Sequence, residues 1–276
     1  MIISDRYEFV YIHIPKCGGS TVRSRLQNFD ETNGAFTGRV EVHPDLGLVD
    51  YVHIPLFVLK KYFPNEYQKV IKYKSFAVVR DPFARFPSSF AQHLKRYGMG
   101  HIKDLSPSDL KSELTRVICD LEKMNDAQTL LPAKYIHFQP QHDYVYHDGR
   151  KIIDAVYGLD DLESLFYNIN EYLGEGESGY YERSEQRVSV NQSVVYRFPA
   201  MRKLITPASP IVKVMLKPFL SDQKYRSLRS IFYTQQGAAL RDLVDSDYVK
   251  SFIEDFYQRD FELLASLDKC RSKESQ

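Results

Sequence analysis

The sequence has few cysteines and almost no net charge, and these shortages exclude several classes of protein. The cysteines are only three, Cys17, Cys119 and Cys270, and none of them belongs to a CxxC pair. This wide spacing argues against a disulfide framework or a zinc site and favours a reducing compartment. The formal net charge of +1 provides no basic surface, so no nucleic-acid partner is expected. Any anion-binding site must be built locally.

Long apolar runs are also missing. No uncharged apolar run reaches the roughly 18 to 20 residues that span a bilayer, and no basic region followed by an apolar one marks the N-terminus. We therefore expect a soluble, cytoplasmic protein without a transmembrane segment. Residues 204–220 are apolar but contain three prolines, which prevent a continuous amphipathic helix. Peripheral attachment to a membrane through this segment stays open as an alternative.

The length of the chain favours a single domain. With 276 residues, of which 43% are hydrophobic, it can bury one sizeable core but is short for two full domains. We expect one domain over residues 1–270 and a disordered tail over residues 271–276.

Two strand-to-helix units are visible in the first hundred residues. Residues 9–14, FVYIHI, form a β-branched and aromatic run that stops at Pro15, and residues 75–79 form a second apolar run. A loop and a helical pattern follow each run. Two such units predict a parallel sheet covered by helices on both faces.

The remaining chain is expected to supply mainly helices and loops. The spacing of apolar and turn-forming residues predicts an irregular loop over 31–50, helices over 56–62 and 106–131, a strand over 152–157 followed by a helix from 160, a long loop over 176–199, and one or two helices within 235–267.

A glycine pair follows the first predicted strand, in the segment PKCGGST at residues 15–21. Consecutive glycines let backbone N–H groups approach an anion closely, and the start of the next helix adds a positive dipole end. Lys16 adds a mobile charge beside them. The segment predicts a phosphate cradle, although a glycine turn that merely caps a helix would look the same. A nucleoside triphosphatase loop, GxxxxGK[ST], places its lysine after the glycines instead of before them.

A second segment, VVRDPFARFPSS at residues 78–89, places Arg80 at the end of a strand and Ser88 eight residues later. A guanidinium fork and a hydroxyl can bind one phosphate from two sides. Arg85 lies between them on the first turn of the predicted helix. It either contacts the acceptor or is a solvated or salt-bridged residue.

Together the two segments resemble the PAPS-dependent sulfotransferases, in particular the group of carbohydrate and heparan sulfate 2-O-sulfotransferases with their bacterial relatives. The resemblance implies an α/β fold, with a single P-loop-like domain whose central parallel sheet is flanked by helices. It implies transfer of the sulfuryl group of 3′-phosphoadenosine 5′-phosphosulfate (PAPS) to a hydroxyl of a carbohydrate or glycolipid-type acceptor, without a metal. The residues that it assigns to the 5′-phosphosulfate are Lys16, Cys17, Gly18, Gly19, Ser20 and Thr21, and those for the 3′-phosphate are Arg80 and Ser88.

Sulfuryl transfer needs in-line placement of the reactants, a cation beside the leaving phosphate and a base for the acceptor hydroxyl. Lys16 is expected to stabilise the leaving phosphate. In the resembled family a histidine before the second motif is the base, and His53 in the segment DYVHIP is its counterpart. His43 is the reserve candidate, while His13, beneath the loop, and His93 are expected to be structural.

Three further segments resemble the family more weakly. Residues 135–144 are expected to line an acceptor groove, residues 187–193 to close over the nucleotide, and residues 256–263 to form a closing helix. Two alternative functions remain open. A P-loop kinase-like nucleotide phosphotransferase would need a hydroxyl and a carboxylate for magnesium. A catalytically silent glycan- or nucleotide-binding module would lack a base beside the cradle.

Overall fold

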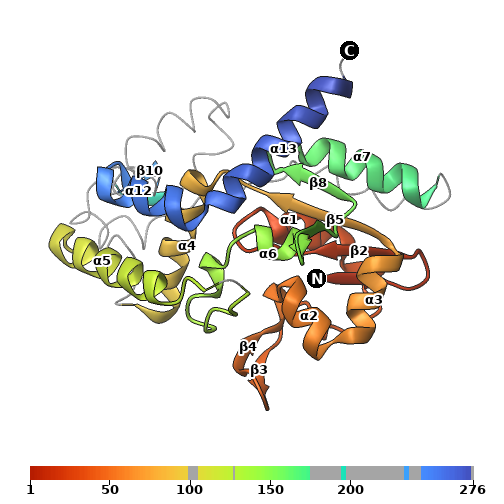
Figure 1. Cartoon of the computed structure of the whole chain (residues 1–276), viewed down its shortest axis with the longest axis horizontal. Helices are drawn as coiled ribbons and strands as arrows, with labels where there is room; N and C mark the ends of the chain where they lie inside the picture. The colour runs from red at the N-terminus through yellow and green to blue at the C-terminus, as the bar shows by residue number, and fades with distance from the viewer. Residues whose placement is uncertain (99–104, 127, 175–193, 197–232, 236–243, 275–276) are drawn as a thin grey trace, which may run out of the picture.

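A four-stranded sheet forms the centre of the molecule (Figure 1). Its order is β1 (Ile2–Ser4), β2 (Phe9–Ile12), β5 (Lys74–Val79) and β8 (Ala155–Gly158). Strands β2, β5 and β8 run parallel, which agrees with the predicted parallel sheet. Strand β1, which the sequence did not predict, adds an antiparallel edge. The computed structural model describes residues 1–98, 105–126, 128–174, 194–196, 233–235 and 244–274.

The register of the sheet brings the ends of three strands together. Ile12 of β2 lies opposite Ala77 of β5, and Val79 of β5 lies opposite Gly158 of β8. All four residues of β2 are buried, as expected for a strand covered on both faces. Because the carboxyl ends of parallel strands reach the same edge, the segments that follow them meet there. Both predicted motifs follow such strand ends.

Helices flank this sheet, and several of them form a layer of their own. Helix α3 contacts β2 and β5, and helix α7 contacts β8. Helix α4 instead contacts α12, at the side of the molecule where α5 also lies (Figure 1). The helices are α1 (Gly19–Leu26), α2 (Leu56–Tyr62), α3 (Pro64–Lys72), α4 (Pro82–Tyr97), α5 (Pro107–Lys123), α6 (His142–Val145), α7 (Leu162–Leu173), α12 (Asp247–Phe256) and α13 (Gln258–Glu274).

Short elements complete the described chain. They are the 3-10 helices η1 (Gln27–Phe29), η2 (Tyr51–His53), η4 (Ile136–Phe138) and η5 (Leu159–Asp161), and the strand pairs β3 (Val40–His43) with β4 (Gly47–Asp50), β6 (Tyr146–His147) with β7 (Arg150–Lys151), and β9 (Val194–Tyr196) with β10 (Tyr233–Gln235).

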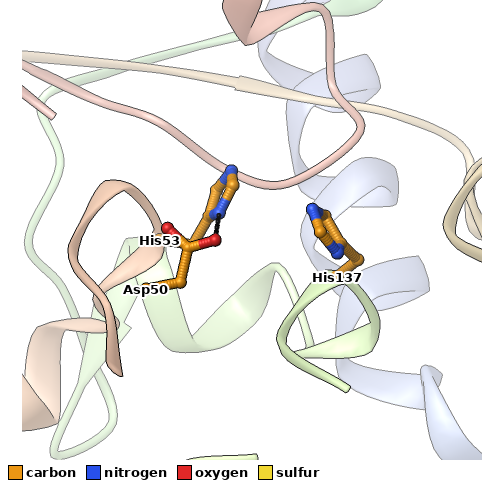
Figure 2. Close-up of side chains that lie close together, drawn as sticks. All are labelled: Asp50, His53 and His137. Atoms are coloured by element: carbon orange, nitrogen blue, oxygen red, sulfur yellow. Dashed lines mark ion pairs between the residues drawn. The ribbon is translucent and has the colours of Figure 1, made fainter. Parts of the chain in front are cut away.

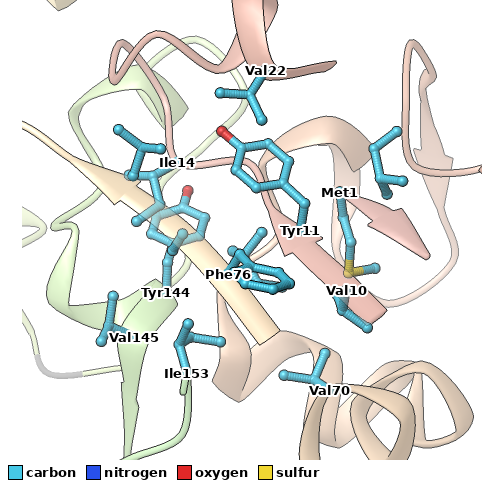
Figure 3. Close-up of a cluster of buried hydrophobic side chains, with 14 of the residues drawn as sticks. Met1, Val10, Tyr11, Ile14, Val22, Val70, Phe76, Tyr144, Val145 and Ile153 are labelled. Carbon is cyan, nitrogen blue, oxygen red and sulfur yellow. The ribbon is translucent and has the colours of Figure 1, made fainter. Parts of the chain in front are cut away.

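The buried apolar side chains form two separate clusters. The first surrounds the sheet and joins residues far apart in sequence, such as Tyr11, Phe76 and Tyr144 (Figure 3). The second lies among α4, α5 and α12 and includes Phe90 and Ile253. The sheet and the helical layer therefore each bury a core of their own.

Several predicted elements need correction. Residues 31–50 are not wholly irregular, because β3 and β4 form a hairpin that projects from the body (Figure 1). Gly47 allows its turn with a φ of 69°. The helix predicted over 106–131 ends at Lys123, and α3 was not predicted. Helix α13 continues to Glu274, and the disordered tail stays a prediction.

Some predictions fall largely outside the described residues. The loop over 176–199 is described only in β9, and the segments 187–193 and 204–220 are not described. Within the described part of the chain, every helix is too short or too polar to pass through a membrane.

Candidate functional site

The loop between β2 and α1 has a backbone that only glycine can follow at two positions. A Cβ atom on Gly18 would lie 2.4 Å from the side chain of Leu159, and one on Gly19 would lie 1.9 Å from the ring of His13. Gly18 has a φ of 75°, and Lys16, with a φ of 64°, also adopts the left-handed region, which strains a residue with a Cβ. Glycine is therefore required at both positions, because Leu159 and His13 pack directly against the loop. The contact with Gly19 confirms that His13 packs beneath the loop.

The start of α1 offers further donors to an anion. The N–H groups of Thr21 and Val22 bond to the carbonyl of Gly18, whereas the earlier amides of the helix have no intrahelical acceptor. No acidic residue lies in the first turn. Among the described residues, the hydroxyls of Ser20 and Thr21 have no hydrogen-bond partner. This helix start favours a bound negative charge.

Cys17 differs from its neighbours because its side chain points into the protein. Its thiol is buried and donates to the carbonyl of Pro15 and to Oε1 of Gln141. Burial raises the pKa of this thiol to about 12. Only the backbone of Cys17 can therefore serve the anion site predicted for it.

Lys16 and Arg80 are two partly buried cations that lie close together. Nη1 of Arg80 donates to the carbonyl of Lys16 at 3.4 Å. No described carboxylate lies within ion-pair distance of either side chain. Burial and the charge of Arg80 lower the pKa of Lys16, and burial lowers that of Arg80. Neighbouring cations that are partly removed from water and have no acidic partner favour an anion between them. We call residues 16–21 together with Arg80 the anion cradle.

A cavity of about 490 Å³ lies beside the anion cradle, at the carboxyl ends of β5 and β8. Arg80 lines it, and so does Leu159, which also touches Gly18. Ser88, which the sequence assigns to the same phosphate as Arg80, does not line this cavity. It is half-buried on α4, and its hydroxyl has no partner within the described part of the chain. The structure thus brings Arg80 to the first loop but shows no such contact for Ser88.

His53 lies in a row of three buried histidine rings. Its ring centroid is 4.8 Å from that of His13 and 5.2 Å from that of His137. Its Nδ1 lies 3.3 Å from Oδ2 of Asp50 (Figure 2), and Oδ1 of the same carboxylate accepts a hydrogen bond from the N–H of Val52. The 3-10 turn of η2 therefore places this carboxylate directly against the imidazole.

The surroundings keep these imidazoles neutral. Burial lowers the pKa of His53, although Asp50 acts in the opposite direction. Burial, His53 and Lys16 together lower the pKa of His137 to about 3. A neutral imidazole can accept a proton, so the row has the protonation state that a general base requires.

The histidine row lies next to the anion cradle. His13 touches both Gly19 and His53, and Lys16 is near enough to lower the pKa of His137. His43 lies elsewhere: its ring packs against Tyr62 and Phe63 in the projecting hairpin region, and its Nδ1 accepts from the N–H of Asp45. The geometry therefore favours His53 over the reserve candidate.

His93 has a structural environment, as the sequence predicted. Its buried ring stacks on Tyr135, and its Nδ1 lies 2.9 Å from the carbonyl oxygen of Lys134.

Asp50, His53 and His137 could also hold a metal ion, since one ligand atom from each lies within 4.8 Å of the others (Figure 2). Two imidazoles and a carboxylate are typical zinc ligands. However, Oδ2 of Asp50 also faces Arg96 at 3.4 Å, and Lys16 lies near His137. Both positive charges oppose a cation. We interpret the cluster as a proton-transfer group, and the absence of a metal stays a prediction.

Arg85 is enclosed in the protein interior. It is fully buried, and it donates to the carbonyls of His137 and Gln139. Its Nη2 lies 3.5 Å from the carboxylate of Asp260, and its guanidinium carbon lies 4.8 Å from the ring centre of Tyr257. The alternative left open for Arg85 is thereby decided in favour of a salt bridge.

Four residues of this region were not assigned a role from the sequence. Asp50 could have been suspected, because it precedes His53 by three residues and an acid beside an imidazole is a common pairing. His137 and Gln141 fall within the segment predicted to line a groove, and Asp260 within the closing helix. Nothing in their spacing indicates the partners that they meet in the fold.

One comparison with known proteins gives a match. A family model described as "Sulfotransferase family" matches residues 1–265, a range that includes both loop motifs, the segment around His53 and α13 as far as Ala265. No curated protein and no solved structure matches the chain.

Proposed function

The chain belongs to the sulfotransferase family, and we propose that it transfers the sulfuryl group of PAPS to a hydroxyl of a carbohydrate or glycolipid-type acceptor in the cytoplasm. Members of this family generally use PAPS. The observation that carries the proposal is the approach of Arg80 to Lys16, two partly buried cations that have no carboxylate within ion-pair distance among the described residues. A nucleotide with phosphates at both its 5′ and 3′ ends suits such a pair.

In the proposed reaction the acceptor oxygen attacks sulfur in line with the bond to the 5′-phosphate. The new sulfur–oxygen bond forms as the bond to the phosphate breaks, so the products are the sulfate ester and adenosine 3′,5′-bisphosphate. Lys16 and the amides at the start of α1 stabilise the charge that develops on the leaving phosphate. The proton of the acceptor hydroxyl passes to His53.

Asp50 supports the role of His53 as base. With Nδ1 lying 3.3 Å from the carboxylate of Asp50, the other nitrogen, Nε2, is the one proposed to accept a proton. The carboxylate also stabilises the imidazolium that forms when the proton is transferred.

Two alternatives are less well supported. A phosphotransferase would be expected to place its lysine after the glycines, and here Lys16 precedes Gly18. A silent binding module would lack a base near the anion cradle. Here His53 contacts the ring of His13, which packs against Gly19.

The first experiment compares the thermal shift caused by adenosine 3′,5′-bisphosphate with that caused by ATP and magnesium. The proposal predicts stabilisation by the bisphosphate and a smaller effect of ATP. A larger effect of ATP and magnesium would favour the phosphotransferase.

The second experiment measures transfer of labelled sulfate from PAPS to a panel of glycans. We expect His53→Gln to abolish most of the transfer and His43→Gln, the matched histidine control, to retain it. Binding of the bisphosphate without transfer to any member of the panel would favour the silent module.

A further inference from the structure

A buried glutamine connects the two motifs of the anion cradle. Oε1 of Gln141 accepts from the thiol of Cys17 at 3.1 Å and from the N–H of Arg80 at 2.8 Å. Its Nε2 donates to the carbonyl of Arg80 at 2.8 Å and to Oδ2 of Asp260 at 3.2 Å. One side chain amide therefore touches the first loop, both backbone groups of Arg80 and the closing helix.

The orientation of this amide is determined by its partners. The four contacts use both acceptor positions of the oxygen and both hydrogens of the nitrogen, so the side chain is fully satisfied. If the amide were flipped, its NH₂ group would face the N–H of Arg80 and the thiol of Cys17, and these are donors. Gln141 is also fully buried, so water cannot replace a lost contact.

Asp260 holds Gln141 in place from α13. Its carboxylate accepts from the backbone N–H of Gln141 at 3.0 Å and of His142 at 2.8 Å, and it pairs with Arg85. Burial raises the pKa of Asp260, while Arg85 and these amides act in the opposite direction. We call Arg85, Gln141 and Asp260 the buried polar network. Every charged member has its partner inside the protein.

We propose that Gln141 is a positioning residue that sets the separation between the loop for the 5′-phosphosulfate and Arg80, so that one nucleotide can bind both. The inference rests on the proposed function. A ligand with two anionic ends gains from two sites that are held in advance at the right separation, because binding the second end then costs little additional ordering. A ligand with one phosphate uses one site and gains little from their separation.

The test compares three ligands by titration calorimetry: adenosine 3′,5′-bisphosphate, adenosine 5′-monophosphate and adenosine 3′-monophosphate. In Gln141→Leu we expect the affinity for the bisphosphate to fall about 10- to 100-fold, and the affinity for each monophosphate to fall less than about threefold. The KM for PAPS should rise accordingly.

The chain offers a matched control in Gln139. It lies in the same segment and is equally buried, and its amide bonds to Leu131, Thr129 and Asp143 instead of the anion cradle. Gln139→Leu should destabilise the protein to a similar degree but leave the ratio of bisphosphate to monophosphate affinity unchanged.

A second pair of variants covers the case in which Gln141→Leu does not fold. Cys17→Ala removes the contact between Gln141 and the first loop, together with the weak contact of the thiol with the carbonyl of Pro15, and Cys17→Ser restores a donor there. The ratio of bisphosphate to monophosphate affinity should fall in the alanine variant and recover in the serine variant. An unchanged affinity ratio in both Gln141→Leu and Cys17→Ala overturns this inference but leaves the proposed function intact. Absence of bisphosphate binding by the unsubstituted protein overturns the proposed function and this inference with it.

Discussion

The anion cradle and the buried polar network each contain an arginine, and the two arginines have opposite environments. Arg80 and Arg85 belong to one short segment, yet Arg80 has no carboxylate partner among the described residues while Arg85 is paired with Asp260. Arg80 is half-buried at the mouth of a cavity, and Arg85 is fully buried. A cation without a partner at the surface of a cavity is available to a ligand. A fully buried cation must be satisfied by the protein itself.

The difference extends to the backbone. In the anion cradle Lys16 adopts a left-handed conformation, which stores strain. The residues of the buried polar network have no positive φ angle. The anion cradle therefore contains backbone strain at a position where a ligand is proposed to bind. The buried polar network, which packs beneath it, has no such strain.

The largest expected effect tests the buried polar network. Arg85→Met should lower the free energy of unfolding by about 3 to 5 kcal/mol, because it leaves the carboxylate of Asp260 buried without its cation. Urea denaturation measures this change. The double variant Arg85→Met with Asp260→Leu should recover part of the loss, since it removes both charges. A loss below about 1 kcal/mol in the single variant would contradict the contrast between the two arginines.

Lys16→Met tests the anion cradle and should show the reverse pattern. We expect kcat to fall about 10²- to 10³-fold, since a donor that stabilises developing charge is lost. The free energy of unfolding should stay the same or rise, because the variant removes an unpaired, partly buried charge. Lys72→Met, which changes an exposed lysine on α3, is the control for both measurements. A destabilised but fully active Lys16 variant would assign this lysine to the structural region.

Arg80→Ala should chiefly affect nucleotide binding. Loss of a charge-assisted hydrogen bond of about 1.5 to 3 kcal/mol would weaken the affinity for adenosine 3′,5′-bisphosphate by roughly 10- to 150-fold. Calorimetric titration measures the affinity, and adenosine 5′-monophosphate serves as the control ligand. Equal affinity of the variant and the unsubstituted protein for the bisphosphate would refute the assignment.

His137 connects the buried polar network to the histidine row, because its carbonyl accepts from Arg85 while its ring faces His53. Its pKa is about 3 in the folded protein and near 6.5 when unfolded, so the unfolded chain binds more protons between these values. The free energy of unfolding should therefore fall as the pH drops below about 6.5, by up to about 1.4 kcal/mol per pH unit. His137→Gln should flatten this dependence in urea titrations at several pH values. An equally steep dependence in the variant would contradict the burial of a neutral ring.

The smallest expected effect concerns Asp50. Because burial lowers the pKa of His53, the acid limb of kcat/KM should have its midpoint below about 6.5. Asp50 raises that pKa, so Asp50→Asn should move the midpoint further down and also lower the plateau. Arg96→Gln, which removes the other partner of Asp50, is the control. A midpoint that moves upward would exclude the proposed pairing.

Local sequence predicted much of the anion cradle. The apolar runs that became β2 and β5, the glycines between β2 and α1, and the placement of Arg80 at a strand end were all readable, because each depends on a few adjacent residues. The β3–β4 hairpin was missed, since its strands are short and largely exposed and their alternation is weak.

What the sequence determined by itself is the set of groups that can meet an anion: backbone turns, helix starts and the charges beside them are local properties. Only the tertiary structure decided which polar groups are left for a ligand and which are used internally. Gln141 and Asp260 are separated by 119 positions and meet only when α13 packs against the segment before α6. Burial and pairing depend on such distant contacts, so two arginines five positions apart in one motif can have opposite roles.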